Sequence, residues 1–299
     1  MTTEIRTVEI EENRQRTGVY GSLDLRFRRG GDGPRTRLIV GEQIPPLRVV
    51  RAFDGDDGMA VVHLHNISGG VLGGDQMHLT AQVEANAQAQ ITTTGSTRLY
   101  RQRDGYTNAA QENRLSVGAG GLLEYLPDSL IPYADSRFRQ TTRIDLAEDA
   151  GLFYWEILTP GRTAKGEEFA YDLLQLELEI VAEGRPIVIE RLRWQPHLHN
   201  LRSPARLGQY THYGVFYACR VGVTDERWLA LERELADEAQ RLTSPGEALW
   251  GVSTLPAHGL SVRVLSRNSR AISAGMLIFW QAIKQKLYGR DAIPPRKVY

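Results

Sequence analysis

The sequence predicts a mainly β protein: a single large β-rich domain, β-helix-like or sandwich-like, with two α-helices in its C-terminal part. From Gly21 to about Val223, short stretches alternate apolar and polar residues and are interrupted by Gly, Pro, Asp and Asn, which is typical of strands and turns. Residues 225–243 and 269–288 carry apolar side chains three or four positions apart instead, which indicates helices. The strand pattern is far the longer, so β structure should dominate.

The expected strands share a period of two, which places alternate side chains on opposite faces of a sheet. The clearest are Met59–His65, Met77–Ala85, Ala89–Thr94, Phe138–Leu146 and Leu173–Val181. A further strand, Pro186–Leu192, follows a turn expected at Gly184–Arg185. We expect these last two strands to form a hairpin.

The two predicted helices carry start and stop signals. Asp225 is the expected N-cap of the first, and Gly289 the expected C′ residue of the second. The apolar surface of the second helix is wider than one docking face requires, which indicates a partner protein. The alternative is a helix buried on two sides within its own domain.

The charge balance, the N-terminal residues and the single cysteine indicate which classes of protein and partner to expect. Lys and Arg together number 36, as do Asp and Glu, so no net charge attracts nucleic acid or a membrane surface, and neither is expected as a partner. Residues 1–17 lack the basic start and apolar run of a secretory signal and should form a flexible tail before a domain spanning 18–299. The lone Cys219 cannot form an internal disulfide, so we expect a cytoplasmic protein and a buried structural thiol.

A glycine-rich run, Gly69–Asp75, invites comparison with loops that bind phosphate through backbone N–H groups. The comparison fails, because no lysine follows the run and a strand rather than a helix comes after it. Glycines needed for tight turns are the plainer interpretation. Asp75 remains a candidate for a metal or partner contact.

Two histidine pairs could supply metal ligands. His63 with His65, and His197 with His199, each place two imidazoles on one face of an extended segment. This allows a β-barrel metalloenzyme that uses all four. The alternative is ordinary surface or hydrogen-bonded histidines, because no acidic residue stands at a metal-motif spacing from either pair.

Three carboxylates occur among large apolar residues: Glu124, Asp128 and Glu156. A carboxylate in such surroundings is costly to bury unless it pairs with a cation. One interpretation is a salt bridge to an arginine, and the other is contact with a passing cation or a partner. No serine lies in a G-x-S-x-G sequence, so nucleophilic catalysis has no support.

Four segments in register over the chain resemble the UreD (UreH-type) urease accessory family. They are Gly69–Asp75, Thr92–Arg101, Leu123–Ala134 and Trp155–Arg162. Leu260–Leu265 and the ending from Leu287 to Arg296 are similar to that family as well. The resemblance extends from about residue 18 to the end of the chain.

The resemblance implies a non-catalytic scaffold for urease maturation, which binds UreF, joins the GTPase UreG through it, and docks on the urease apoprotein. Nickel would pass through it in transit, with no tightly bound cofactor. Asp75, Glu124, Asp128 and Glu156 are then candidates for the nickel passage or an interface. The expected UreF contacts are apolar residues of the last helix: Ile272, Met276, Phe279, Trp280 and Ile283.

Overall fold

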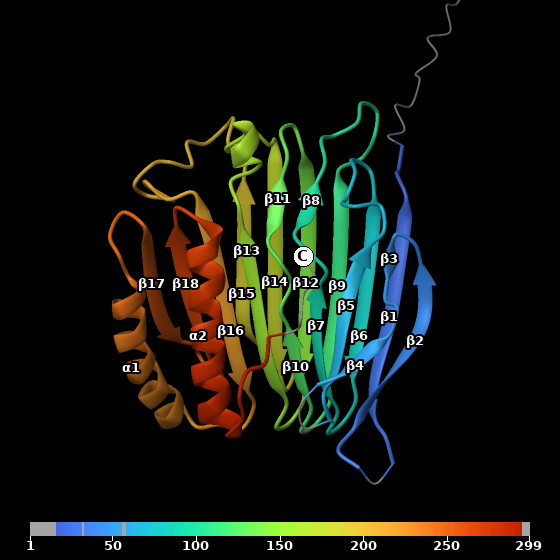
Figure 1. Ribbon diagram of the computed structural model, residues 1–299, viewed down its shortest axis with the longest axis vertical. Helices are drawn as coiled ribbons and strands as arrows, with labels where there is room; N and C mark the ends of the chain where they lie inside the picture. The colour runs from blue at the N-terminus through green and yellow to red at the C-terminus, as the bar shows by residue number, and fades with distance from the viewer. Residues whose placement is uncertain (1–15, 32, 56–57, 295–299) are drawn as a thin grey trace, which may run out of the picture.

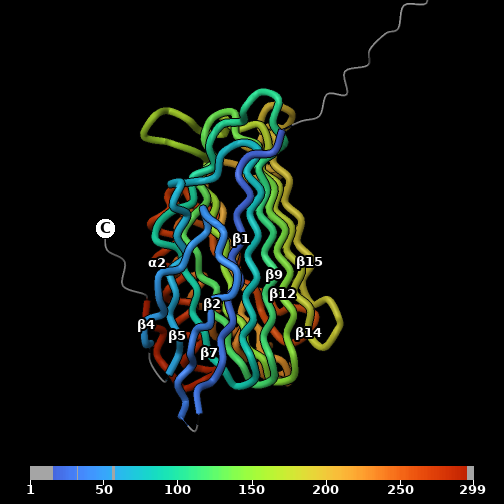
Figure 2. The backbone as a smooth tube through the Cα atoms, turned by 90° about the vertical axis from the view of Figure 1, so that its right-hand side faces the viewer, coloured from blue at the N-terminus to red at the C-terminus, as the bar shows by residue number. Residues whose placement is uncertain are grey.

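The structure is a computed structural model that describes residues 16–31, 33–55 and 58–294. This part of the chain forms two β-sheets stacked face to face, with helices on the outer face of one sheet (Figures 1 and 2). The mainly β fold with C-terminal helices, predicted from the alternation of apolar and polar residues, is confirmed.

The seven-stranded sheet has the order β15-β14-β12-β9-β6-β1-β2. Its strands are β1 (Tyr20–Arg29), β2 (Thr36–Ile44), β6 (Gln76–Val83), β9 (Ala109–Val117), β12 (Arg137–Leu146), β14 (Leu173–Ala182) and β15 (Arg185–Trp194). Its five middle strands, β1, β6, β9, β12 and β14, run parallel to one another.

The eleven-stranded sheet has the main order β17-β18-β16-β13-β10-β7-β5-β3, with β4, β8 and β11 pairing at its sides. Its strands are β3 (Leu47–Arg48), β4 (Ala52–Asp54), β5 (Ala60–Asn66), β7 (Gln88–Thr93), β8 (Thr97–Leu99), β10 (Leu122–Tyr125), β11 (Leu130–Pro132), β13 (Gly151–Leu158), β16 (His212–Arg220), β17 (Ala248–Thr254) and β18 (Gly259–Ser266).

The chain alternates between the two sheets from β5 to β14, and each pass adds a parallel strand beside the previous strand of the same sheet. This path combines the coil of a β-helix with the two layers of a sandwich. Over the described residues, the sheets remain two open layers and do not close into a barrel. The inward faces of both sheets therefore enclose one interior.

Strand β12 shows why the alternating pattern produces this packing. Phe138, Gln140, Thr142 and Ile144 point inward and are buried, whereas the residues between them are more exposed. The predicted hairpin of β14 and β15 is also present, but its turn is Glu183–Gly184 rather than Gly184–Arg185. Both turn residues have positive φ, which matches the twist of a two-residue hairpin.

Helices α1 (Asp225–Leu242) and α2 (Ser269–Tyr288) pack on the outer face of the eleven-stranded sheet near β16, β17 and β18 (Figure 1). The N-cap of α1 is Thr224, whose hydroxyl accepts a hydrogen bond from the Arg227 N–H, so the prediction of Asp225 was one residue late. Gly289 ends α2 in the left-handed conformation, as predicted. A short 3₁₀ helix, η2 (Thr163–Lys165), lies in the loop before β14.

The predicted N-terminal tail, residues 1–17, falls largely outside the described residues. Arg16 is described and is bonded to the body of the fold: its N–H donates to the Gly105 carbonyl at 2.7 Å and its carbonyl accepts from the Thr107 N–H at 2.9 Å. The organisation as one domain over 18–299 stays a prediction.

Candidate functional site

A cavity of about 530 Å³ lies between the two sheets. The seven-stranded sheet contributes two inward-facing amides, Gln111 of β9 and Gln140 of β12. The other sheet and its loops contribute most of the remaining wall, including His65, Thr93, Ser96, Arg98, Tyr125, Asp128, Tyr154 and Glu156. An interior space with this many polar groups is unlike the apolar core that fills the rest of the sandwich.

Glu156 of β13 is the most perturbed acidic group of the cavity. Its carboxylate accepts a hydrogen bond from the Gln140 amide at 2.5 Å, and no described basic side chain forms an ion pair with it. Burial, with a smaller contribution from the negative charge of Glu190, raises the pKa of Glu156 from 4.5 to about 7, although Tyr154 and Gln140 oppose the rise. The group can therefore gain or lose a proton near neutral pH.

Tyr154, two residues before Glu156 on the same face of β13, also borders the cavity. Its ring stacks on Tyr125 with centroids 5.7 Å apart. Its hydroxyl is fully buried beside Glu156 and makes no hydrogen bond of normal geometry with the described residues. Burial, reinforced by the charge of Glu156, raises the pKa of Tyr154 well above its ordinary value, so the phenol stays neutral.

Asp128 lies in the loop after β10 and borders the same cavity. The Thr93 hydroxyl donates to its carboxylate at 2.8 Å and accepts from its backbone N–H at the same distance. The Trp155 indole donates to the Pro127 carbonyl at 2.8 Å, which holds the loop against β13. Of the four predicted acids, the structure thus brings Asp128 and Glu156 to one cavity.

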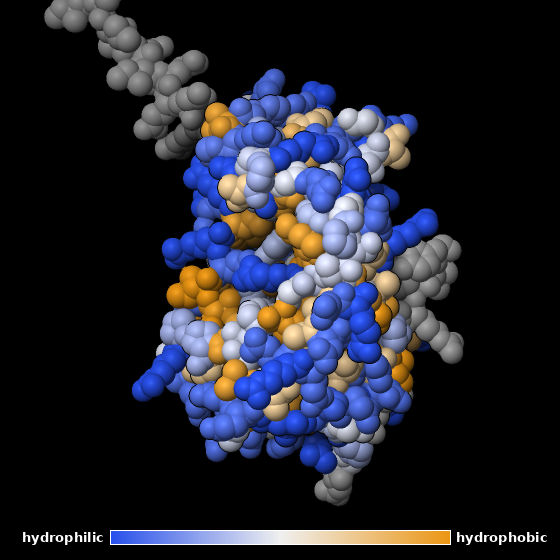
Figure 3. Space-filling model, turned by 90° about the vertical axis from the view of Figure 1, so that its left-hand side faces the viewer, coloured by the Kyte–Doolittle hydropathy of each residue, from blue (hydrophilic) through white to orange (hydrophobic). Residues whose placement is uncertain are grey.

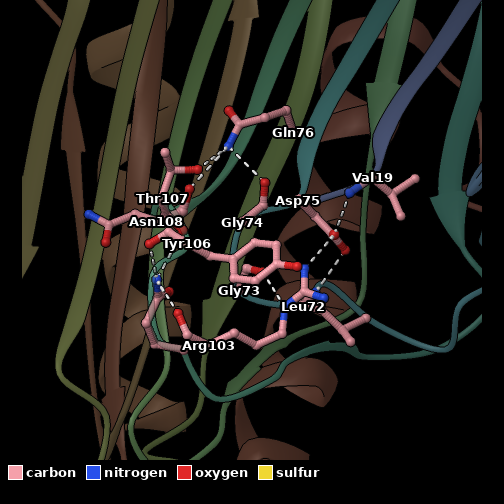
Figure 4. Close-up of polar contacts among 11 residues, drawn as sticks. Val19, Leu72, Gly73, Gly74, Asp75, Gln76, Arg103, Tyr106, Thr107 and Asn108 are labelled. Carbon is pink, nitrogen blue, oxygen red and sulfur yellow. Dashed lines mark hydrogen bonds and ion pairs between the residues drawn. The ribbon is translucent and has the colours of Figure 1, made fainter. Parts of the chain in front are cut away.

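Asp75 does not border this cavity and has partners of its own (Figure 4). Its carboxylate accepts the backbone N–H groups of Val19 and Leu72 at 3.0 and 2.9 Å, and the Arg103 guanidinium lies 3.8 Å away. Gly74 has φ of +92°, which favours glycine in this turn. The glycine-rich run is therefore a turn that Asp75 stabilises, in agreement with the plainer interpretation.

Glu124 is fully buried on the opposite face of its sheet, toward the helices. Its carboxylate accepts from the Gln90 amide at 2.7 Å and pairs with the Lys284 ammonium of α2 at 2.8 Å. Lys284 is itself buried, with 8% of its side chain exposed. The partner predicted as an arginine is thus a lysine, and the pair fixes α2 on β10.

The four histidines do not form one site. His63 and His65 lie on β5 of the eleven-stranded sheet, whereas His197 and His199 are exposed in the loop after β15 of the other sheet. His197 lies 3.5 Å from Asp172, and His63 packs edge-on against Phe53. Among the described residues, no three His, Cys, Asp or Glu side chains are grouped so that they could hold a metal ion. The structure therefore does not support the alternative of a β-barrel metalloenzyme that uses all four histidines: in the described part of the chain they are not grouped, and the two sheets do not close into a barrel.

The apolar residues predicted to bind UreF face inward instead. Ile272, Met276, Phe279, Trp280 and Ile283 are each 0% exposed and pack against β13, β16 and β18. The physical reason is that α2 also receives Trp250 from β17, which lies directly over Gly275, so two sides of the helix are covered. A partner of the folded chain would meet Ile278, which is 40% exposed. UreF binding by this helix stays a prediction.

Three features complete the outcome for the predicted residues. Cys219 is buried, and burial raises the pKa of its thiol to about 12, in keeping with a packing role. Gln111 and Gln140 were not among the site residues predicted from the sequence. Each is a polar residue at an inward position of an alternating strand, and this pattern could have indicated a polar interior. Within the described range, neither helix has the length and hydropathy needed to cross a lipid bilayer.

Residues 19–299 match the family described as UreD urease accessory protein. A urease accessory protein UreD from Herpetosiphon aurantiacus is 51% identical over 265 residues, which cover 89% of this chain and 92% of the relative. Those of Cenarchaeum symbiosum and Pseudomonas fluorescens are 35% and 32% identical, covering 86% and 93% of this chain and 88% and 94% of theirs. The chain belongs to the UreD family of urease accessory proteins.

Proposed function

We propose that this chain is a non-catalytic scaffold that conducts nickel through its interior to apo-urease, in a cytoplasmic complex with UreF-type and UreG-type proteins. The observation that carries the proposal is the half-buried carboxylate of Glu156, which borders an interior cavity without a basic partner among the described residues. Such a group is costly to keep charged, and a passing cation would compensate that cost.

The other cavity groups suit transit rather than storage. Asp128, His65 and the amides of Gln111 and Gln140 offer oxygen and nitrogen atoms at separate points of the wall. Ni²⁺ binds imidazole and carboxylate, and a compact set of such ligands would retain it. Dispersed single ligands, completed by water, would allow it to move from one to the next.

The test is co-expression of the urease subunits and all accessory proteins with Glu156→Gln or Asp128→Asn in this chain. Both changes keep side-chain shape and remove a charge. We expect the complexes to form in normal amount while nickel per urease active site falls several-fold. Glu112→Gln, a change on the outer face of β9, is the matched control and should leave both quantities unchanged.

Two results would contradict the proposal. Normal nickel content with Glu156→Gln and with Asp128→Asn would remove the cavity from the route. Loss of complex in proportion to loss of nickel would assign both residues to assembly.

A further inference from the structure

A groove follows the edge of the seven-stranded sheet at β15. It has a volume of about 380 Å³, and five consecutive residues of this strand, from Glu190 to Trp194, border it. Because successive side chains of a strand point to opposite faces, five in a row can border one groove only along the edge of the strand. The corresponding side of the molecule is visibly hollowed, with apolar groups around the depression (Figure 3).

The backbone of β15 has one unpaired side. Among the described strands its one partner is β14, and residues 186–194 make no backbone hydrogen bond to any other described segment. In an antiparallel pair, alternate residues direct their N–H and C=O groups away from the partner strand. The edge of β15 therefore offers the groove a row of donors and acceptors with which a further strand could pair.

The floor of the groove is apolar, because the two sheets end at different places on this side. Strand β15 lies over β16 and β18, since Glu190 is hydrogen-bonded to residues of both. The eleven-stranded sheet continues past β18 to β17, whereas the seven-stranded sheet ends at β15. Leu265 of β18 borders the groove, and its cross-strand neighbour Leu249 of β17 is 39% exposed. One more strand beside β15 would cover this apolar ledge.

The charged groups that border the groove are mainly basic. Arg191, Arg193 and Arg206 lie in its wall, and no described acidic side chain forms an ion pair with any of them. Among the described residues that border the groove, Glu190 is the one carboxylate, and Arg263 already pairs with it at 2.8 Å. The groove is therefore complementary to an acidic partner rather than to a cation.

The side chains on the outer face of β15 indicate where the acidic groups of such a partner would lie. Ile189, Arg191 and Arg193 are all exposed there. Glu177, the neighbour of Arg191 on β14, accepts a hydrogen bond from Gln175 rather than from the arginine. Opposite charges on neighbouring strands stabilise a sheet, and like charges destabilise it. Acidic residues beside the two arginines fit this rule, whereas a second copy of β15 would bring four arginines together.

We propose that the edge of β15 binds an extended acidic segment of a partner protein, which joins the seven-stranded sheet as a further strand. Its outward side chains are acidic and lie beside Arg191 and Arg193, and its inward side chains are apolar and cover Leu265 and Leu249. Backbone hydrogen bonds supply affinity in this mode of binding, and the alternate side chains supply specificity. The interaction does not depend on nickel passage through the cavity.

The first experiment measures binding of a fluorescein-labelled seven-residue peptide that alternates Glu and Val to the full chain, by fluorescence anisotropy. We expect saturable binding, together with slower amide hydrogen exchange at residues 189–193 of β15. The same peptide with Lys in place of Glu should not bind, because its charge matches that of the groove. The Glu–Val peptide with methylated backbone amides should not bind either, because it cannot donate hydrogen bonds to the strand.

The second experiment tests the arginines. Arg191→Gln with Arg193→Gln should weaken binding of the Glu–Val peptide roughly fivefold to tenfold, because two exposed ion pairs are lost. Arg37→Gln with Arg139→Gln is the matched control. It also removes two exposed arginines from the seven-stranded sheet, but from β2 and β12, and neither residue borders the groove. The control should bind the peptide as the unchanged chain does.

Three results would overturn the proposal. Equal weakening by both pairs of substitutions would reduce the attraction to overall charge. Arginines on an edge strand can also serve only to prevent pairing with other chains, and in that case the Glu–Val peptide would neither bind nor slow exchange in β15. Protection of residues 189–193 that grows with protein concentration, without peptide, would assign the edge to a second copy of the chain. None of these readouts involves nickel, so they are independent of the test with Glu156→Gln.

Discussion

Replacing Glu156 by Gln should make the protein more stable above neutral pH, because the cavity holds this carboxylate at an energetic cost. The pKa of Glu156 rises from 4.5 to about 7 on folding. Each tenfold change in the acid dissociation constant corresponds to about 1.4 kcal/mol of free energy, so this rise in the pKa of Glu156 corresponds to about 3 kcal/mol of stability. The folded state binds the proton more tightly, so this stability is fully present below pH 4.5 and is lost as pH rises through 7. Glutamine stays neutral and avoids the loss.

The assay is urea unfolding of the unchanged chain and Glu156→Gln at two pH values on either side of the transition. Of the total, about 2 kcal/mol should appear as a growing advantage of the variant between pH 5.5 and pH 8. Glu112→Gln, on the outer face, controls for general effects of removing a carboxylate. An advantage that does not change with pH, or a variant less stable than the unchanged chain at pH 8, would refute the assignment of Glu156 as an uncompensated interior charge.

The remaining predictions concern residues with structural partners. Asp75→Ala should lower the free energy of unfolding by about 2–4 kcal/mol, because two backbone N–H groups lose their acceptor; urea unfolding measures this, and a loss below about 1 kcal/mol would argue against the role in the turn. Lys284→Met should cost about 3–5 kcal/mol by leaving Glu124 buried and unpaired, and adding Glu124→Gln should recover most of it. Strictly additive losses in that double variant would contradict a direct pair. Cys219→Ala should cost about 1–2 kcal/mol and leave urease activation intact, since a thiol whose pKa is raised to about 12 is not a thiolate at neutral pH. Loss of activation in a folded variant would reassign the thiol.

The alternating pattern predicted individual strands well because it depends on local geometry. The predicted strand Phe138–Leu146 lies entirely within β12, with its apolar positions inward as expected. The pattern could not predict which strands pair. A period of two shows which side chains share a face of a strand, but it does not show which strand lies next to it in the sheet. For example, β1 pairs with β6, whose residues lie more than 50 positions further along the chain. Many pairings of this kind determine how the chain passes back and forth between the two sheets.

Two of the four predicted acids, Asp128 and Glu156, border the candidate cavity, and the other two do not, for a physical reason. All four acids stand in glycine-rich or apolar sequence, which reveals that a charge is buried but not what compensates it. For Asp75 and Glu124 the compensating groups, Arg103 and Lys284, come from distant segments and are visible only in three dimensions. The apolar surface of α2 looked wider than one docking face requires for the same reason. Trp250, which comes from β17, covers a side of the helix that its own sequence cannot show to be covered.

Glu124 and Glu156 show how one sheet can use the same residue type for opposite purposes. Both lie on neighbouring strands, β10 and β13, but they point to opposite faces. Glu124 faces α2 and meets a lysine at 2.8 Å, so its charge contributes to holding the helix in place. Glu156 faces the cavity and meets an amide, a phenol and the charge of Glu190, so it is held near the pH at which it changes charge. On the proposed function, a fold that neutralises one carboxylate and leaves the other without a basic partner keeps the second available for a passing cation.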